Sequence, residues 1–135
     1  MAEPMSLQII TPDAIVFEGK STFFVGKAID GQFGILPNHA PMILALDLAP
    51  LRIDQPDGTS RELAVFGGFC EIEHNKVGIV TPDCQDPSSI DVERARRAKE
   101  RAEGRLSNPT PDIDVERAEA ALQRALLRLH VTKQL

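Results

Sequence analysis

The sequence changes character abruptly at the proline-flanked segment 82–87. Before it, short apolar runs alternate with turn residues, a pattern typical of an all-β sandwich or barrel. After it, Ala, Arg, Glu and Leu predominate, and these residues favour helices. A chain of 135 residues has room for one modest domain and an appendage. We therefore expect a β-rich domain over residues 1–87 and a helical domain over residues 88–135.

Charge is distributed unevenly between these two parts. Residues 1–87 contain five Lys or Arg against twelve Asp or Glu, a net charge of −7. Residues 88–135 contain ten Lys or Arg against eight Asp or Glu, a net charge of +2. Because more than a third of the second part is charged, its residues are expected to cover the surface of helices and not to fill a core.

The first part contains about nine candidate strands, each bounded by turn residues. The strongest hairpin signal is Pro56-Asp57-Gly58, because Asp-Gly supplies the positive φ angles that a tight turn requires. Asn75-Lys76 occupies a similar place between two strand patterns. The predicted strands are 7–10, 14–18, 21–25, 33–36, 42–46, 51–55, 62–66, 69–73 and 77–80.

The second part contains two helical patterns separated by the breaker segment 107–111. We expect the first helix to begin at Ser88 or Ser89 as its cap and to run to about Leu106. The second helix is expected to begin with Thr110 as its cap and Pro111 at its first position, and to run to about Val131. Apolar residues recur at spacings of three and four in both helices, which predicts an antiparallel hairpin; they are Val92, Ala95, Ala98, Ala102 and Leu106, and then Val115, Ala118, Leu122, Ala125 and Leu129.

The hexapeptide Ile-Asp-Val-Glu-Arg-Ala occurs twice, at 90–95 and at 113–118. One interpretation is structural, because each helix needs an acidic first turn and an apolar stripe. The other concerns the first copy, where Arg94, Arg101, Arg124 and Arg128 could face one side of the folded hairpin. Arg forks bind phosphate oxygens, and Asp91 could accept hydrogen bonds from a nucleobase or ribose. The chain contains no GxxxxGK[ST] loop, so such a site would hold a nucleotide without hydrolysing it.

The segment 31–41 is the other distinctive stretch, with prolines on both sides of Asn38-His39-Ala40. These prolines stiffen an exposed loop. His39 could act as an acid or base, but no Ser, Cys or second His has triad or metal spacing near it, which favours a contact role.

Several other classes of protein fit the sequence poorly. The longest apolar run, 42–46, is far shorter than the ~20 residues of a membrane span, and no signal-peptide pattern occurs. Cys70 and Cys84 have no metal or redox spacing, so we expect two reduced packing residues. The basic residues of the first helix are interleaved with acids, and neither Trp nor Tyr is present for stacking, which disfavours nucleic acid.

At residues 31–41, Gly-Gln-Phe-Gly-Ile-Leu-Pro-Asn-His-Ala-Pro, the sequence resembles the signature loop of the epsilon chain of rotary ATP synthase, and the likeness covers nearly the whole chain. The resemblance implies an α+β fold, with an N-terminal antiparallel β-sandwich followed by a C-terminal antiparallel two-helix hairpin. It implies a non-catalytic, regulatory and structural subunit of the rotor, or central stalk, on the cytoplasmic face of the bacterial cell membrane. Membrane association would arise only through the complex.

The resemblance also implies partners and site residues. The sandwich holds the gamma chain and touches the ring of c chains, with Asp30, Gly31, Gln32, His39 and Met42 as contact residues. The hairpin extends toward the catalytic alpha and beta chains and restrains ATP hydrolysis, so that the subunit couples proton transport to ATP synthesis. No cofactor is required. Regulatory ATP would bind the folded hairpin through residues that match the family motif and its supporting arginines, namely Ile90, Asp91, Arg94, Ala95, Arg101, Arg124 and Arg128.

One position departs from the pattern of nucleotide-binding members, because Gln85 stands where they carry an acidic residue five positions before the isoleucine. Two other functions stay open from the residues alone. The chain could be a stand-alone nucleotide sensor that binds no gamma chain, or a small hydrolase that uses His39 in a deep pocket.

Overall fold

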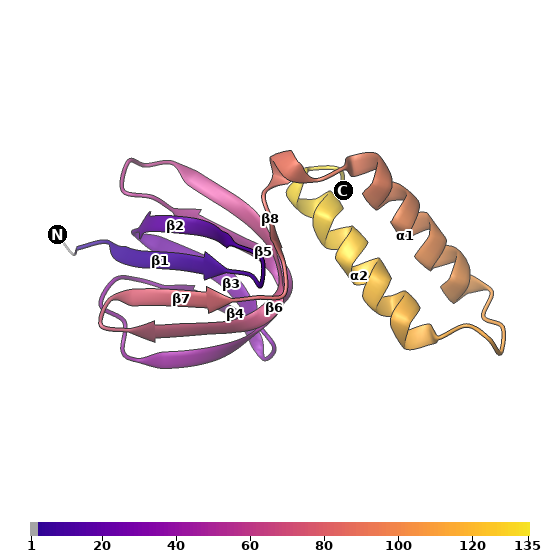
Figure 1. The fold of residues 1–135 in the computed structure, drawn as a ribbon, viewed down its shortest axis with the longest axis horizontal. Helices are drawn as coiled ribbons and strands as arrows, with labels where there is room; N and C mark the ends of the chain where they lie inside the picture. Colours follow the sequence, from indigo (N-terminus) through magenta and orange to yellow (C-terminus); the bar gives the residue numbers. More distant parts are fainter. Residues whose placement is uncertain (1–2) are drawn as a thin grey trace. The chain divides into compact units, whose positions relative to one another are not determined.

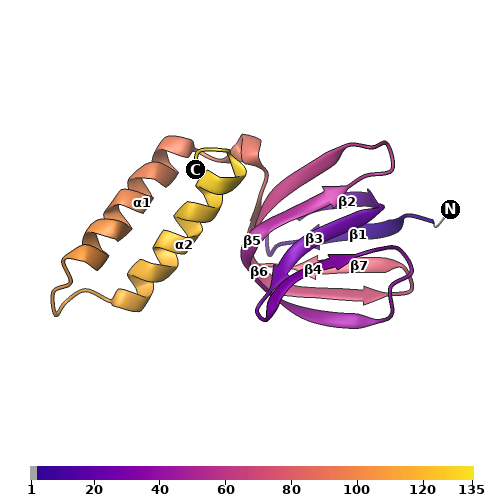
Figure 2. The ribbon, with the colours of Figure 1, turned by 180° about the vertical axis from the view of Figure 1, so that it is seen from behind.

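The computed structural model describes residues 3–135, which form two compact units, one ending at Asp86 and the other beginning at Pro87 (Figures 1 and 2). The first unit is built from strands and the second from helices. This division follows the change in residue composition at the segment 82–87. Across residues 3–135, none of the helices combines the length and the apolar character that crossing a membrane demands.

The first unit is one continuous set of paired strands in the order β2-β1-β7-β6-β5-β3-β4, with β8 paired to β6. All pairs are antiparallel except β1 and β7, which run parallel. The fold class predicted from the sequence, a β-sandwich followed by two helices, is confirmed. The strands are β1 (Met5–Ile10), β2 (Ile15–Ser21), β3 (Phe23–Ala28), β4 (Gly31–Ile35), β5 (Met42–Asp54), β6 (Ser60–Glu73), β7 (Lys76–Val80) and β8 (Cys84–Gln85).

Two long strands replace four of the predicted short ones. β5 joins the predicted strands 42–46 and 51–55, and β6 joins 62–66 and 69–73. The pairing of β5 with β6 skips a step between Leu46↔Gly68 and Leu48↔Phe66, where Gly67 and Gly68 have φ angles of 86° and 103°. The register is the same on both sides of this step, so neither strand carries an extra residue and both strands continue through it. The curvature of β5 and β6 is visible in Figure 2.

Alternate residues of each strand point into the core of the sandwich. In β1 the inward positions are Met5, Leu7 and Ile9, each at most 1 % exposed. This alternation is what a strand with one buried face requires. Cys70 and Cys84 are free and buried, as predicted for packing residues. The other core residues include Phe17, Phe24, Ile35, Leu51, Ile53, Leu63, Val65, Ile72, Val77 and Ile79.

The sequence predicted two of the tight turns between antiparallel strands. The predicted hairpin at 56–58 is confirmed, with Asp54 paired to Ser60 and Gly58 at a φ of 87°. The turn between β6 and β7 lies one residue earlier than predicted. It is formed by His74 and Asn75, whose φ angles of 51° and 60° give the two positive values of a type I′ turn.

The helical unit contains a short 3₁₀ turn, η1 (Pro87–Ser89), and two helices, α1 (Val92–Ser107) and α2 (Val115–Val131). Both predicted helix starts were wrong by several residues. The caps are Asp91 and Asp114, and not a serine at 88–89 or Thr110. Each aspartate accepts a hydrogen bond from the backbone N–H three residues later. Ser88 and Ser89 lie within η1 instead, and the hydroxyl of Thr110 donates to Asp112.

The two helices pack against each other in antiparallel orientation, as predicted (Figure 1). The buried residues Ala95, Ala102, Ala118 and Ala125 all fall on the predicted stripes. Small side chains at these positions let two helix axes approach closely. The start of α1 is joined to the end of the chain by a 3.0 Å bond from Arg96 Nη2 to Gln134 Oε1.

Candidate functional site

The first copy of the repeated hexapeptide forms the beginning of α1. Asp91 Oδ1 accepts a 3.0 Å hydrogen bond from the backbone N–H of Arg94, and the carbonyl oxygen of Asp91 accepts one from Ala95. Ala95 is buried, Ile90 is half-buried, and the side chains of Asp91 and Arg94 are exposed. The motif therefore starts the helix and also presents a carboxylate and a guanidinium to solvent.

Of the four predicted arginines, Arg94 and Arg128 lie toward one end of the helical unit, and Arg101 and Arg124 lie near the middle of their helices. Arg94 is near the start of α1 and Arg128 near the end of α2, and these two ends are neighbours in the antiparallel pair (Figure 1). Arg101 lies about 10 Å further along α1, and Arg124 about 6 Å back along α2, at ~1.5 Å per residue. Arg94, Arg101 and Arg124 form no ion pair with any of the residues 3–135. Three exposed cations are thus available to bind an anion.

The second copy of the hexapeptide lies at the other end of the hairpin. Asp114 Oδ1 caps α2 by accepting a 3.1 Å bond from the N–H of Arg117. Arg117 and Arg105 line a hollow of about 440 Å³, but Asp112 and Asp114 line it too. The hydroxyl of Thr110 donates to Asp112 and lowers the pKa of that carboxyl, so Asp112 stays ionised and offsets the arginine charge.

The five predicted contact residues of the sandwich fall into two groups, one at the start of β4 and one after its end. Asp30 is exposed in the turn between β3 and β4, where the N–H of Ile29 donates to Ala45 at 3.0 Å. Gly31 has a φ of 140°, and Gln32 is exposed on β4.

His39 and Met42 come after β4, in and beyond the loop 36–41. Met42 pairs with Ile72, next to the β6–β7 turn. His39 is half-buried, and its Nδ1 lies 2.8 Å from the carbonyl oxygen of Ala40, which can only accept, so Nδ1 carries the proton. His39 and Met42 thus follow β4 in the chain, whereas Asp30 precedes it and Gly31 and Gln32 begin it.

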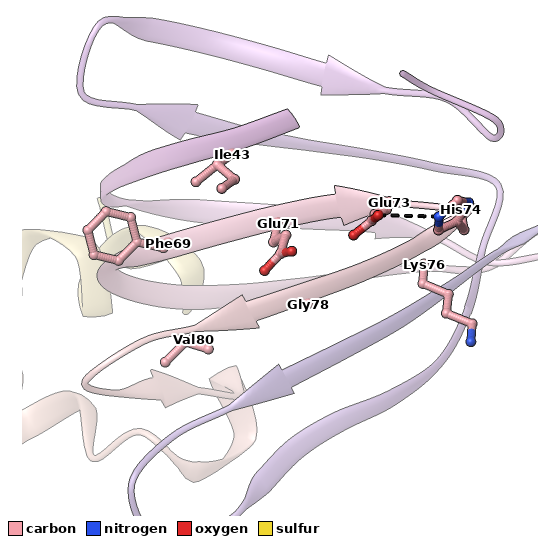
Figure 3. Close-up of a pocket in the computed structure, with 8 residues that line it drawn as sticks. All are labelled: Ile43, Phe69, Glu71, Glu73, His74, Lys76, Gly78 and Val80. Atoms are coloured by element: carbon pink, nitrogen blue, oxygen red, sulfur yellow. Dashed lines mark ion pairs between the residues drawn. The ribbon is translucent and has the colours of Figure 1, made fainter. Parts of the chain in front are cut away.

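An exposed apolar surface, which we call the β5–β7 patch, lies on the outer face of the sandwich (Figure 3). It consists of Ile43, Phe69 and Val80, with exposed fractions of 70 %, 61 % and 59 %. These side chains line a hollow of about 370 Å³ together with Glu71, Glu73, His74, Lys76 and Gly78. Figure 3 shows the apolar residues at one end of the hollow and Glu73, His74 and Lys76 at the other, with His74 Nε2 3.2 Å from Glu73 Oε1.

Strand register assembles this patch from three strands. Ile43 of β5 pairs with Glu71 of β6, and Phe69 of β6 pairs with Val80 of β7. Isolated exposed apolar residues are ordinary on a protein surface, but a contiguous group rimmed by charge marks an interaction site. Sequence reasoning missed the patch because the three residues are far apart in the chain and become neighbours only through the register.

The described residues offer little that suggests catalysis. Burial raises the pKa of the Cys70 thiol and of the Cys84 thiol to about 12, so neither is a nucleophile near neutral pH. Within residues 3–135, no group of three or more His, Cys, Asp or Glu side chains is arranged to hold a metal ion.

Comparison with protein families matches both units. Residues 4–86 match the family described as "ATP synthase, Delta/Epsilon chain, beta-sandwich domain". Residues 88–133 match "ATP synthase, Delta/Epsilon chain, long alpha-helix domain".

Similar proteins match over almost their full length. An ATP synthase epsilon chain of Brevibacillus brevis is 42 % identical over 129 residues, which cover 96 % of this chain and 98 % of the relative. One of Desulforamulus reducens is also 42 % identical, with coverages of 96 % and 97 %.

Solved structures share the fold at lower identity. A chain in the Euglena gracilis mitochondrial ATP synthase matches with a TM-score of 0.72 and 19 % identity, covering 97 % of this chain and 78 % of that one. A chain in the central stalk and c-ring of Tetrahymena thermophila mitochondrial ATP synthase matches with a TM-score of 0.63 and 17 % identity, with coverages of 97 % and 98 %. With both units matched by its models and full-length relatives at 42 % identity, this chain belongs to the ATP synthase delta/epsilon chain family.

Proposed function

We propose that this chain is a non-catalytic rotor subunit of a bacterial ATP synthase, which anchors itself through the sandwich and restrains ATP hydrolysis through the helices. The observation that carries the proposal is the full-length match to epsilon chains, combined with a division into two compact units that carry different surfaces. The subunit would couple proton transport to ATP synthesis at the cytoplasmic face of the membrane. Its attachment there would depend on the complex.

The β5–β7 patch is the proposed docking surface for the gamma chain. Three apolar side chains more than half exposed would lose contact with water when a partner covers them, and the charged rim would fix the orientation. The proposed contacts with the ring of c chains are the His39 loop with Met42 after it, and the end of the β3–β4 hairpin, which carries Asp30, Gly31 and Gln32. Because β4 separates the two groups, each would meet the ring as a separate contact.

The helical unit is the proposed movable element. The buried residues of α1 are only Ala95 and Ala102, so this helix covers little apolar area. Helices of 16 and 17 residues are marginal in water when isolated and depend on packing for their order. A partner that offers apolar surface could therefore draw the helices toward the catalytic alpha and beta chains.

Regulatory ATP is proposed to stabilise the folded hairpin. Its phosphates would meet the unpaired guanidinium groups of Arg94, Arg101 and Arg124 and that of Arg128, while Asp91, Ile90 and Ala95 complete the site. A ligand that binds one state alone stabilises that state by about 2.7 kcal/mol at a hundredfold excess over Kd. The Nε2 of Gln85 donates to Asp83 at 2.9 Å, so an uncharged and already engaged side chain stands where nucleotide-binding relatives carry an acid. We expect weaker ATP binding than in those relatives.

The inhibitory role is tested on the assembled enzyme. An ATP synthase that carries the chain truncated after Pro87 is expected to hydrolyse ATP faster than the enzyme with the full chain, because the restraint is gone. Proton pumping should persist, since the sandwich still joins the rotor. Identical hydrolysis rates for the two enzymes would contradict the inhibitory role.

Nucleotide binding is tested by limited proteolysis of the full chain with and without MgATP. ATP is expected to protect α1 and α2, and Arg94→Ala or Arg128→Ala to abolish the protection. The matched control is Arg117→Ala, which changes the corresponding residue of the second hexapeptide copy and should leave the protection intact. Equal cleavage of the unmodified chain with and without ATP would exclude this part of the proposal.

A further inference from the structure

Asn75 joins three segments that are far apart in the sequence. Its Oδ1 accepts a 2.8 Å hydrogen bond from the backbone N–H of Asn38, in the loop that carries His39. Its Nδ2 lies 3.2 Å from the carbonyl oxygen of Glu3 and 3.3 Å from that of Pro4, to which it donates. Its own carbonyl oxygen accepts a 3.1 Å bond from the N–H of Ser6. One side chain thus ties the His39 loop to the N-terminal segment through the β6–β7 turn.

The backbone presents this amide in a fixed direction. Asn75 has a φ of 60°, and the preceding His74 has a φ of 51°, so both occupy the left-handed region. Asn is several-fold enriched in this region among residues other than glycine. Asn38, at the other end of the bond, also has a positive φ, of 63°. Two constrained turns therefore face each other across one hydrogen bond.

Few interactions other than this hydrogen bond hold the loop 36–41 in place. Within the described residues, the bond from Asn38 to Asn75 is the one hydrogen bond that links residues 36–41 to the rest of the sandwich. The contact of His39 with Ala40 lies inside the loop. The loop is otherwise held by its connections to β4 and β5 and by its prolines.

We infer that Asn75 is a positioning residue for the partner contact of the His39 loop, an inference that rests on the proposed function. Asn75 acts on this contact through its hydrogen bonds to Asn38, Glu3 and Pro4. It orders residues 36–41 before docking, so that docking carries no added entropy cost for ordering this loop. Loss of this restraint adds a conformational entropy cost to docking, and we expect the affinity to fall about tenfold.

Whether Asn75 orders the loop is tested on the full chain by amide hydrogen exchange measured residue by residue. Asn75→Gly keeps the positive φ but removes the side-chain bonds, so exchange at the Asn38 N–H should become about tenfold faster. Asn75→Asp keeps an oxygen that accepts from Asn38 but cannot donate to Glu3 or Pro4, so it should restore protection at Asn38. The matched control is Asp57→Ala, which removes side-chain bonds to Thr59 in another turn and should leave Asn38 unchanged.

The effect of Asn75 on docking is measured with ATP synthase depleted of this chain and reconstituted with each variant. The readout is the concentration that half-restores coupled proton pumping. Asn75→Gly should raise it about tenfold, while Asn75→Asp and Asp57→Ala should match the unmodified chain. A defect of Asn75→Gly that Asn75→Asp rescues is a result that general destabilisation does not produce.

Three outcomes would overturn the inference, and they are distinguishable. Unchanged exchange at Asn38 in Asn75→Gly would show that the bond does not hold the loop. Faster exchange with unchanged reconstitution, while His39→Ala impairs reconstitution, would remove the positioning role but leave the ring contact in place. If His39→Ala and Asn75→Gly both reconstitute normally, the ring contact of this loop fails as well.

Discussion

Replacing Phe69 with alanine tests the proposed gamma-chain surface most directly. Phe69 lies on β6 in the middle of the β5–β7 patch, paired with Val80 of β7, and its side chain is 61 % exposed. Aromatic side chains bury roughly 150–250 Å² when fully covered, so about 120 Å² of Phe69 remains for a partner to cover. At about 25 cal/mol per Å², covering that area contributes ~3 kcal/mol at most.

The measured effect should be smaller than this limit but still large. Association costs rotational and side-chain entropy, so buried area converts incompletely into affinity. We expect Phe69→Ala to weaken binding of the purified gamma chain between about tenfold and a hundredfold, as measured by isothermal titration calorimetry. The fold should survive, because losing an exposed cross-strand pair costs about 1 kcal/mol at most.

The matched control is Ile15→Ala, which shortens another exposed apolar side chain, 55 % exposed, on β2. It should leave gamma-chain affinity within about twofold, because a surface substitution away from the interface changes little. If Phe69→Ala binds as tightly as the unmodified chain while circular dichroism shows both folded, the patch is not the gamma-chain surface. An equal loss for Ile15→Ala would refute the localisation to β5, β6 and β7.

Two further predictions concern the sandwich itself. Gly68→Ala should lower the free energy of unfolding by about 3 kcal/mol or more in urea titrations, because a Cβ there would lie 2.0 Å from the carbonyl oxygen of Val80 and φ is 103°. The control is Gly78→Ala, because Gly78 has open space around it. Equal stability of the two variants would contradict the reasoning. Cys70 and Cys84 should resist thiol reagents at pH 8 in the native chain and react fully in denaturant, since burial raises the pKa of each thiol from 9.0 to about 12. Above pH 9 the unfolded chain loses these thiol protons while the folded chain keeps them, so the free energy of unfolding should decline between pH 9 and 12. A free energy of unfolding that stays constant over that range would contradict the raised pKa of the thiols.

The division into a β-rich unit and a helical unit was predictable because it depends on local signals. Turn residues such as Pro56-Asp57-Gly58 mark strand ends, and three-and-four spacing marks helices. The positions of the helix caps were not predicted correctly, because Ser88, Ser89 and Thr110 are also good caps. Local preference alone did not decide among several polar residues within one turn of each other.

The features that depend on pairing between distant strands could not be read from the sequence. The β5–β7 patch needs the register that places Phe69 beside Val80, and a register shift of one residue would turn these side chains to the other face. The bond between Asn38 and Asn75 likewise joins residues 37 positions apart. The adjacent glycines Gly67 and Gly68 could have suggested an interruption of the pairing, since glycine inside a strand pattern often marks a bend or a close backbone approach.

The repeated hexapeptide shows how one local requirement can recur in two different surroundings. Both copies place aspartate at the cap, arginine three residues later with its N–H bonded to that cap, and a buried alanine next to it. Helix initiation therefore accounts for the repetition without any ligand. The surroundings differ, because the first copy lies at the end of the hairpin that also carries Arg128, whereas the hollow at the second copy contains Asp112. An ionised carboxylate there opposes a phosphate, so we expect a nucleotide to choose the first copy on electrostatic grounds, although the two sequences are identical.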